Sequence, residues 1–185
     1  GQARELKAAG VKMCGGSSCI HAPYVKKLKG ELAEDTHGEI LGGYVRAPVS
    51  MENEYGGFFF YSQHMIEMVC EIFGRYPVSV KAKKLGDVTE VEFNYDGYTV
   101  HGMFVEHNYV YYACHFSEKT VNGMNLESTD EHNWFKSEFD EFYSLLHGAD
   151  SPVGYQDFIS SVFVMNAIER SLKSGKEEKV NKYEV

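Results

Sequence analysis

The sequence has 185 residues, 43% of them apolar and 14% aromatic, so it holds enough apolar material for a folded core and is not a disordered chain. Its 18 Lys and Arg residues against 27 Asp and Glu residues give a net charge of −9. This balance excludes a typical nucleic-acid binder, because phosphate contacts need clustered basic side chains. No apolar stretch approaches the ~20 residues that span a bilayer, so we expect no membrane partner.

Four cysteines lie at irregular positions, Cys14, Cys19, Cys70 and Cys114. This spacing is not that of a disulfide framework or a zinc site, so we expect reduced thiols in a cytoplasmic protein without a metal. The first residues show no basic segment followed by an apolar one, so we expect no signal peptide. Because the sequence begins with Gly1 rather than Met, we expect it to be a piece cut from a longer chain.

The first fifty residues predict helices and short strands in alternation. The expected elements are a helix at 4–9, a strand at 11–14, a helix from Pro23 and a strand at 39–47. A βα piece at the very start of a chain looks like the tail of a larger unit.

A longer helix is predicted over 58–73, because one stripe of side chains recurs at helical spacing and Gly74 follows as a stop. The stripe consists of Tyr61, His64, Met65, Met68 and Ile72.

The second half predicts strands first and helices afterwards. Strands are expected at 78–85, 89–95, 98–106 and 109–116, with Asp96-Gly97 as a tight turn, so we expect an antiparallel meander. Helices are expected at 131–147 and at about 155–174. In the first of these, Phe135, Phe139, Phe142 and Leu146 recur at helical spacing.

The best candidate for chemistry is His64. The sequence has no Gly-x-Gly-x-x-Gly, P-loop, Gly-x-Ser-x-Gly or His-Glu-x-x-His motif. His64 shares a helical stripe with Tyr61, and imidazole titrates near neutral pH, as proton transfer requires. From the residues alone the alternative stays open that His64 is a core histidine and that Tyr61 only packs.

Residues 56–67, GGFFFYSQHMIE, resemble the Gly-Gly…His helix of the glucose–fructose oxidoreductase/inositol dehydrogenase (Gfo/Idh/MocA) family. Residues 155–176 resemble the last helix of that family, and residues 135–148 resemble the aromatic helix before it. The order of elements also agrees: strand, His helix, antiparallel strands and two helices. The resemblance covers about residues 35–180.

The resemblance implies an α+β fold, an open mixed and largely antiparallel sheet with helices packed on one face, preceded by a short βα remnant of a Rossmann domain. Residues 1–34 would be this remnant of the nucleotide-binding domain, and residues 35–185 the substrate-binding and oligomerisation domain. The exposed sheet face, rich in Tyr and Phe, would form a homodimer or a higher homo-oligomer.

The resemblance also implies an NAD(P)-dependent oxidoreductase of a sugar, a polyol or a related carbonyl compound. NAD or NADP would bind the full-length protein, whereas this fragment would bind neither tightly and would be inactive alone. His64 takes the acid/base position of the family's helix. The family's Lys of a Glu-Lys-Pro motif has no counterpart, since Glu118-Lys119 is followed by Thr120.

One position departs from the family. Many members carry an Asp four residues before the His, where it orients the imidazole, and this chain has Phe60 there. Either another group orients His64, with Tyr61 the nearest polar candidate, or the chemistry is altered. The departure supports an alternative function as a non-catalytic ligand-binding or dimerisation module. A monomeric, free-standing α+β ligand-binding domain is a third reading.

Four side chains are candidate substrate contacts. Tyr61 lies on the His64 stripe, and Arg46 on a strand would pair with a carboxylate or phosphate, unless it is a solvated strand-edge charge. Tyr155 and Asp157 begin the last helix and would border the cleft. For Asp157, stabilisation of the helix N-terminus is the simpler explanation.

Overall fold

The computed structural model describes residues 2–34, 37–126, 131–182 and 184. The strands are β1 (Ile40–Val49), β2 (Ser79–Leu85), β3 (Val88–Asn94), β4 (Thr99–Glu106), β5 (Tyr111–Ser117), β6 (Thr120–Leu126) and β7 (Glu178–Lys179). The helices are α1 (Gln2–Ala8), the 3-10 helix η1 (Ser18–His21), α2 (Pro23–Ala33), α3 (Phe58–Phe73), α4 (Glu131–Leu146), α5 (Tyr155–Phe158) and α6 (Ser160–Ser174).

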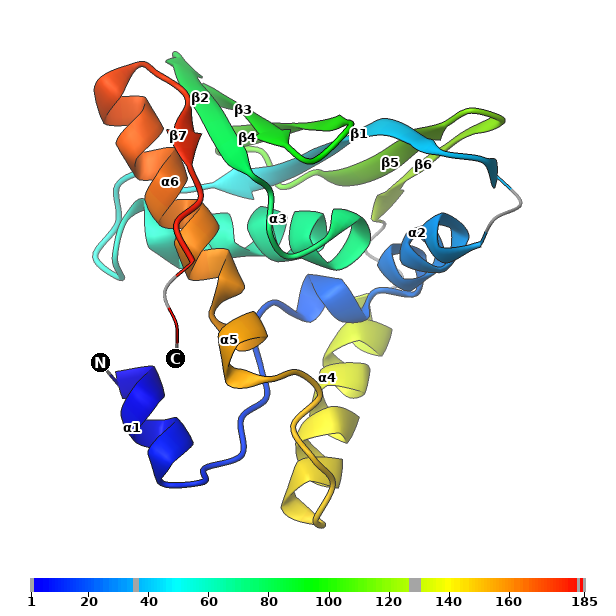
Figure 1. The fold of residues 1–185 in the computed structure, drawn as a ribbon, viewed down its shortest axis with the longest axis vertical. Helices are drawn as coiled ribbons and strands as arrows, with labels where there is room; N and C mark the ends of the chain where they lie inside the picture. Colours follow the sequence, from blue (N-terminus) through cyan, green and yellow to red (C-terminus); the bar gives the residue numbers. More distant parts are fainter. Residues whose placement is uncertain (1, 35–36, 127–130, 183, 185) are drawn as a thin grey trace.

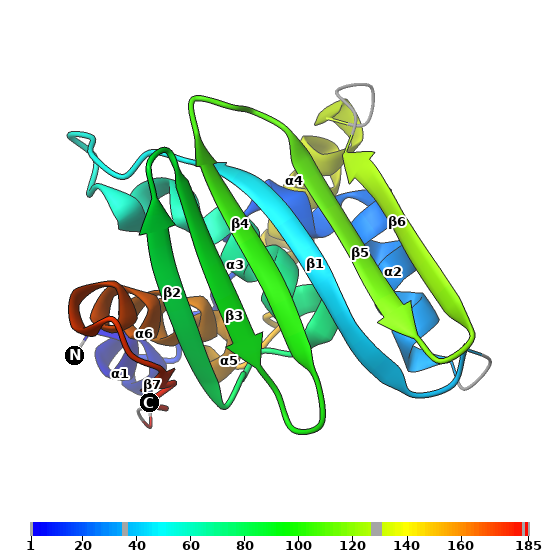
Figure 2. The same cartoon turned by 90° about the horizontal axis from the view of Figure 1, so that it is seen from above.

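The strands form one mixed sheet in the order β6-β5-β1-β4-β3-β2-β7. Helices α2, α3 and α6 lie against one face of this sheet (Figure 1). Seen from above, the other face carries no described helix (Figure 2). The expected α+β class, an open and largely antiparallel mixed sheet with helices on one face, is therefore confirmed.

The strand order differs from the predicted meander at one point. Strands β2, β3 and β4 pair antiparallel in sequence order, but β1 lies between β4 and β5, parallel to the first and antiparallel to the second. The prediction that β4 pairs with β5 was wrong, because β1, which comes earlier in the sequence, pairs with that edge of β4 instead. Strands β6 and β7 were not predicted.

The strand predicted at 11–14 is also absent. These residues pair with no strand among the described residues. They are held instead by the loop after α4: Lys12 Nζ donates to the carbonyl of Gly148 at 2.9 Å, and the Met13 N–H donates to Ser151 Oγ at 2.8 Å. Without a neighbouring strand, a β-prone run such as this one forms no ladder.

Helix α3 lies under the middle of the sheet, and two glycines allow it to come close. A Cβ at Gly43 on β1 would overlap the ring of Phe73, and a Cβ at Gly102 on β4 would lie 2.8 Å from Met65 Cε. Met65 and its neighbours on this side of α3 are fully buried in the core. The sheet therefore fixes which side of α3 faces outward, and with it the direction of His64.

Helix α2 belongs to the same core. Val25 and Leu28 are fully buried in it, and Tyr24 Oη donates to the carbonyl of Ala113 on β5 at 2.8 Å. Glu31 Oε2 lies 3.0 Å from Nε2 of the buried His115. Residues of α2 thus pack with the sheet, and the domain boundary expected between residues 34 and 35 stays a prediction that rests on the resemblance.

Helix α4 forms where the sequence predicts it, but its aromatic stripe is largely exposed. Trp134 is buried and α4 packs on η1, whereas the stripe of Phe135, Phe139, Phe142 and Leu146 is more than a third exposed at each position. Helix α4 extends away from the sheet, so nothing described covers that side (Figure 1). Within the described part of the chain, no helix combines the length and apolar character that crossing a bilayer requires.

Candidate active site

The structure brings His64 and Tyr61 together at a cavity of ≈ 400 Å³. The two side chains lie on one side of α3, three positions apart, and their rings meet edge to face with 5.0 Å between centroids. Residues from η1, α3, the start of β5 with the loop before it, and the start of α4 line the cavity: Ser18, Cys19, Tyr61, His64, Tyr109, Tyr111, Trp134 and Phe135.

Ser17 forms a hydrogen bond with one nitrogen of the His64 imidazole. Its Oγ lies 2.6 Å from Nδ1 of His64, and the serine is 1% exposed. The same oxygen accepts the Cys19 N–H at 3.2 Å, since Ser17 is the N-cap of η1. The group that orients His64 is therefore Ser17 and not Tyr61. The sequence signals a cap at Ser17, but not that the capping residue reaches a helix 47 positions away.

Glu67, the next residue on this side of α3, holds the loop that carries Ser17. Its Oε2 accepts the backbone N–H of Ser17 at 2.6 Å, and its Oε1 accepts the Ser161 hydroxyl at 3.4 Å. A Cβ at Gly16 would overlap the Glu67 carboxylate, and Gly16 has φ +118°, a conformation that favours glycine. Burial raises the pKa of the Glu67 carboxyl. Helix α3 thus binds this loop through two hydrogen bonds to Ser17, one from His64 and one from Glu67.

The cavity is uncharged near neutral pH. Burial lowers the pKa of His64, and no carboxylate of the described residues hydrogen-bonds its ring, so the imidazole is neutral. Burial raises the pKa of the Cys19 thiol to about 11 and also raises the pKa of Tyr111. None of the lining side chains is Lys, Arg, Asp or Glu. The site therefore offers hydroxyl groups, one imidazole and aromatic faces, which suit a neutral polar ligand.

Arg46 lies on the other side of the sheet from His64. Its neighbours Val45 and Ala47 point into the core, so strand alternation directs Arg46 to the face without helices. Its Nε is buried and has no hydrogen-bond partner among the described residues. The structure does not bring Arg46 to the His64 cavity, and its contact with a substrate stays a prediction.

Tyr155 and Asp157 also lie outside the lining of this cavity. Tyr155 Oη donates to the carbonyl of Val11, and Asp157 Oδ1 accepts the hydroxyl of Tyr76 at 2.6 Å. Both side chains thus form hydrogen bonds to segments that are distant in the sequence but adjacent in the fold. Their predicted place at the edge of a substrate cleft remains a prediction.

The His64 cavity does not suit a dinucleotide or a metal ion. The chain has no glycine-rich βα turn, and the His64 cavity presents no basic side chain to a pyrophosphate. In the described ranges, no group of three or more His, Cys, Asp or Glu side chains is arranged to hold a metal ion. The His64 cavity therefore does not fit the pyrophosphate of a dinucleotide.

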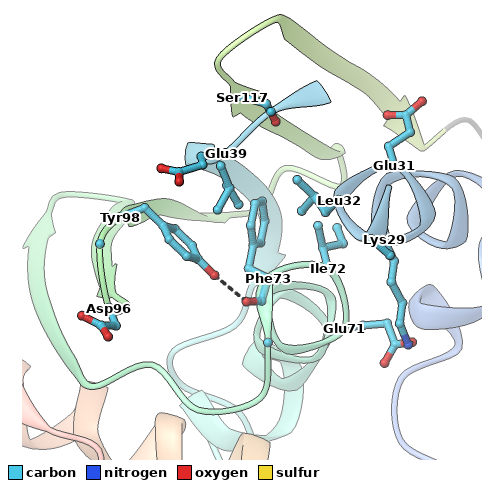
Figure 3. Close-up of a pocket in the computed structure, with 15 residues that line it drawn as sticks. Lys29, Glu31, Leu32, Glu39, Glu71, Ile72, Phe73, Asp96, Tyr98 and Ser117 are labelled. Carbon is cyan, nitrogen blue, oxygen red and sulfur yellow. Dashed lines mark hydrogen bonds and ion pairs between the residues drawn. The ribbon is translucent and has the colours of Figure 1, made fainter. Parts of the chain in front are cut away.

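A larger cavity of ≈ 630 Å³ lies at the far end of α3, about two turns beyond His64 (Figure 3). Leu32, Ile72 and Phe73 line it, and Tyr98 Oη donates to the Phe73 carbonyl at 2.7 Å. None of the candidate residues named from the sequence lines this cavity. Glu71, also in the lining, pairs with Lys29 at 2.6 Å and with Arg75 at 3.1 Å, so its carboxylate is already paired with two basic side chains.

Comparisons with known proteins match the fold and not the sequence. No protein-family model and no curated protein matches the sequence. Among solved structures, myo-inositol 2-dehydrogenase from Lactobacillus plantarum aligns with a TM-score of 0.79 and 13% identity, over 97% of this chain and 68% of that one. The scyllo-inositol dehydrogenase from Lactobacillus casei, with bound NAD(H) and scyllo-inositol, aligns with a TM-score of 0.75 and 12% identity, over 94% and 66%.

GenD2 from gentamicin A biosynthesis, in complex with NAD, aligns with a TM-score of 0.80 and 15% identity, over 97% of this chain and 68% of that one. Each alignment takes in nearly all of this chain and about two thirds of the other. The structure thus confirms the Gfo/Idh/MocA resemblance at the level of the fold: along its length the chain has the fold of inositol dehydrogenases and related oxidoreductases.

Proposed function

We propose that this chain is the substrate-binding and dimerisation part of an NAD(P)-dependent oxidoreductase that acts on a sugar, a polyol or a related carbonyl compound. The observation that carries the proposal is His64, which is fixed by Ser17 and faces a tyrosine-lined cavity in the fold of NAD-bound dehydrogenases. In this role His64 contacts the substrate oxygen at the reacting carbon.

The chemistry of the cavity supports a neutral, polyhydroxylated substrate. Its lining combines the hydroxyls of Tyr61, Tyr109 and Tyr111 with the imidazole of His64 and the rings of Trp134 and Phe135. Hydroxyl and imidazole groups match the many donors and acceptors of a polyol, and no charged side chain of the lining calls for a charged ligand. Scyllo-inositol, bound in one of the solved structures of this fold, is a compound of this kind.

The cofactor belongs to residues outside this chain. Residues 1–34 would then be the remnant of the nucleotide-binding domain and residues 35–185 the substrate-binding domain. NAD or NADP would supply the hydride chemistry, and the isolated chain would bind neither tightly and turn over no substrate.

The helix-free sheet face is the proposed dimer surface. Tyr44 and Tyr112 lie on it with their rings 6.0 Å apart, and Met103 and Arg46 lie beside them. A half-buried aromatic surface of this kind is typical of a face that a partner covers. We further propose that the protein is cytoplasmic, in keeping with four free cysteines.

The test is an NAD(P)-linked assay on the full-length protein. Myo-inositol, scyllo-inositol and a panel of sugars would be supplied with NAD or NADP, and the absorbance of the reduced cofactor followed. We expect oxidation of at least one polyol or sugar, and none by residues 1–185 alone under the same conditions. Absence of turnover with every member of the panel and both cofactors would count against the enzyme.

One observation favours a second candidate, a non-catalytic ligand-binding module. Position 60, one turn before His64, holds a phenylalanine and no carboxylate; Phe60 is 44% exposed, with its ring tilted against Tyr55 and edge to face with Tyr61. Trp134, the single tryptophan of this chain, lines the cavity, so its fluorescence reports ligand binding there. A polyol that changes this fluorescence in the 185-residue chain, while the full-length protein shows no turnover, would favour the binding module.

A further inference from the structure

The two nitrogens of the His64 ring have different surroundings. Nδ1 lies 2.6 Å from Ser17 Oγ, while Nε2 has no hydrogen-bond partner among the described residues. Since His64 lines the cavity, Nε2 is the nitrogen left for a ligand. The proton of the neutral ring sits on one nitrogen or the other, and its position decides whether His64 donates to or accepts from that ligand.

From this geometry we infer that Ser17 is the positioning residue of the site: its hydroxyl donates to Nδ1 of His64 and so places the imidazole proton on Nε2, ready to donate to a substrate oxygen. The inference rests on the proposed function only in taking a substrate as the ligand. The tautomer itself follows from residues of this chain.

The direction of the Ser17–His64 hydrogen bond follows from the serine's other contacts. A hydroxyl has one proton to give and two lone pairs. One lone pair of Ser17 Oγ accepts the Cys19 N–H at 3.2 Å. The other nearby acceptor for the proton is the sulfur of Cys19, which is protonated and a weak acceptor. The Ser17 proton is therefore directed to Nδ1, and Nε2 carries the N–H.

This arrangement reverses what a carboxylate would do. A carboxylate only accepts, so it holds the proton on Nδ1 and leaves Nε2 as an acceptor, the state of a general base. A hydroxyl that donates to Nδ1 gives the opposite tautomer. His64 is then a hydrogen-bond donor, suited to a carbonyl or alkoxide oxygen of the substrate.

The backbone of Ser17 is fixed well enough to set the tautomer. Its N–H donates to Glu67 Oε2 at 2.6 Å and its carbonyl accepts the Ile20 N–H at 3.2 Å. Glu67 and His64 project from the same side of α3, so the helix holds both the loop and the ring. Ser17 and His64 therefore keep their relative position through contacts with one element.

The experiment is ¹⁵N NMR of the histidine side chains in the full-length protein at neutral pH, with His64→Gln to assign the His64 signals. We expect His64 in the wild type to carry its proton on Nε2, with a deprotonated Nδ1. In Ser17→Ala this preference should be lost, and in Ser17→Thr, which keeps a hydroxyl, it should return. A wild-type ring with its proton on Nδ1 would overturn the inference without the need for any variant.

The matched control is Ser171→Ala. Ser171 is also fully buried, accepts the Ala82 N–H at 2.8 Å and donates to the Lys176 carbonyl at 2.6 Å, but it lies at the end of α6 and does not touch His64. Loss of this hydroxyl should lower the melting temperature and leave the His64 signals unchanged. A His64 tautomer that shifts equally in both variants would show a general loosening and contradict the role of Ser17.

Kinetics separate this inference from the proposed function. With the polyol that the full-length enzyme oxidises, Ser17→Ala should raise KM about tenfold, the effect of one misplaced hydrogen bond. If the His64 tautomer changes in Ser17→Ala but the full-length protein shows no turnover, the inference is supported and the proposed function is contradicted. Turnover of a polyol together with a His64 tautomer that is unchanged in Ser17→Ala would support the proposed function and contradict the inference.

Discussion

Glu67 accepts the backbone N–H of Ser17 at 2.6 Å, although 50 positions separate the two residues in the sequence. This bond ties the loop before η1 to the middle of α3. Because the same loop carries the hydroxyl that contacts His64, the carboxylate of Glu67 supports the geometry of the cavity without lining it. Residues from the first twenty of the chain are thus part of the site.

Replacement of Glu67 should change how stability depends on pH. Burial raises the pKa of this carboxyl, so the folded protein holds the proton to a higher pH than the unfolded chain does. The stability that this group contributes is therefore present at low pH and is lost as pH rises from the ordinary carboxyl pKa through the raised one. Glu67→Gln removes this loss, so the melting temperature of the variant minus that of the wild type should increase as pH rises from 4 to 8. Parallel curves over that range would contradict the prediction.

Substitution of His64 should affect turnover more than stability. If His64 has the proposed contact with the substrate oxygen, His64→Ala removes it, and kcat/KM of the full-length protein should fall by about 10²-fold or more. His147→Ala is the control, because His147 is an exposed histidine after α4 that hydrogen-bonds only locally, to the carbonyl of Tyr143. An unchanged rate together with a lower melting temperature in His64→Ala would mean that His64 is a core histidine with a structural role alone.

Gly16 should tolerate no side chain. In Gly16→Ala the new Cβ meets the Glu67 carboxylate and the backbone keeps φ +118°, so we expect a loss of about 1–3 kcal/mol in the free energy of unfolding. The matched control is Gly10→Ala, where φ is also positive, +66°, but no atom lies within 4 Å of the new Cβ. Chemical denaturation of both variants should show the larger loss at Gly16. Equal losses would mean that backbone conformation alone matters there.

The open sheet face should carry the dimer contact. Tyr112→Glu places a charge on that face, beside Arg46 and Tyr44, and burial of the charge in an interface would oppose association, so light scattering of the full-length protein should shift from dimer to monomer. Tyr143→Glu on the exposed side of α4 is the control and should leave the dimer intact. A wild-type protein that is already monomeric would favour the free-standing ligand-binding domain instead.

The sequence was most informative where the signal is local. Helix α3 begins and ends at the predicted residues, Phe58 and Phe73, because a strong apolar stripe is followed directly by Gly74. The Asp96-Gly97 turn likewise joins β3 to β4 as expected. These features depend on neighbours within a few positions, which a pattern along the chain records.

What the sequence did not reveal depends on distant partners. The position of β1 between β4 and β5, the contact of Ser17 with His64 and the exposed stripe of α4 each depend on which segments meet in space. Arg46 shows the same limit, because its strand was predicted but not the face to which it points. The helical stripe indicates Tyr61 of α3 as the group that orients His64, whereas the hydrogen bond comes from Ser17 in the loop before η1.

The position of β1 has a consequence for the order of folding. Strands β2, β3 and β4 follow one another through short connections, so their hairpins can form early. Strand β1 must wait for Thr99 and its neighbours on β4 before its own ladder can start at Gly42. Strands β5 and β6 are also joined by a short turn, and β5 pairs with the other edge of β1. The closing of this long-range ladder should therefore limit the folding rate, and the amides of β1 should gain protection from hydrogen exchange after those of β3.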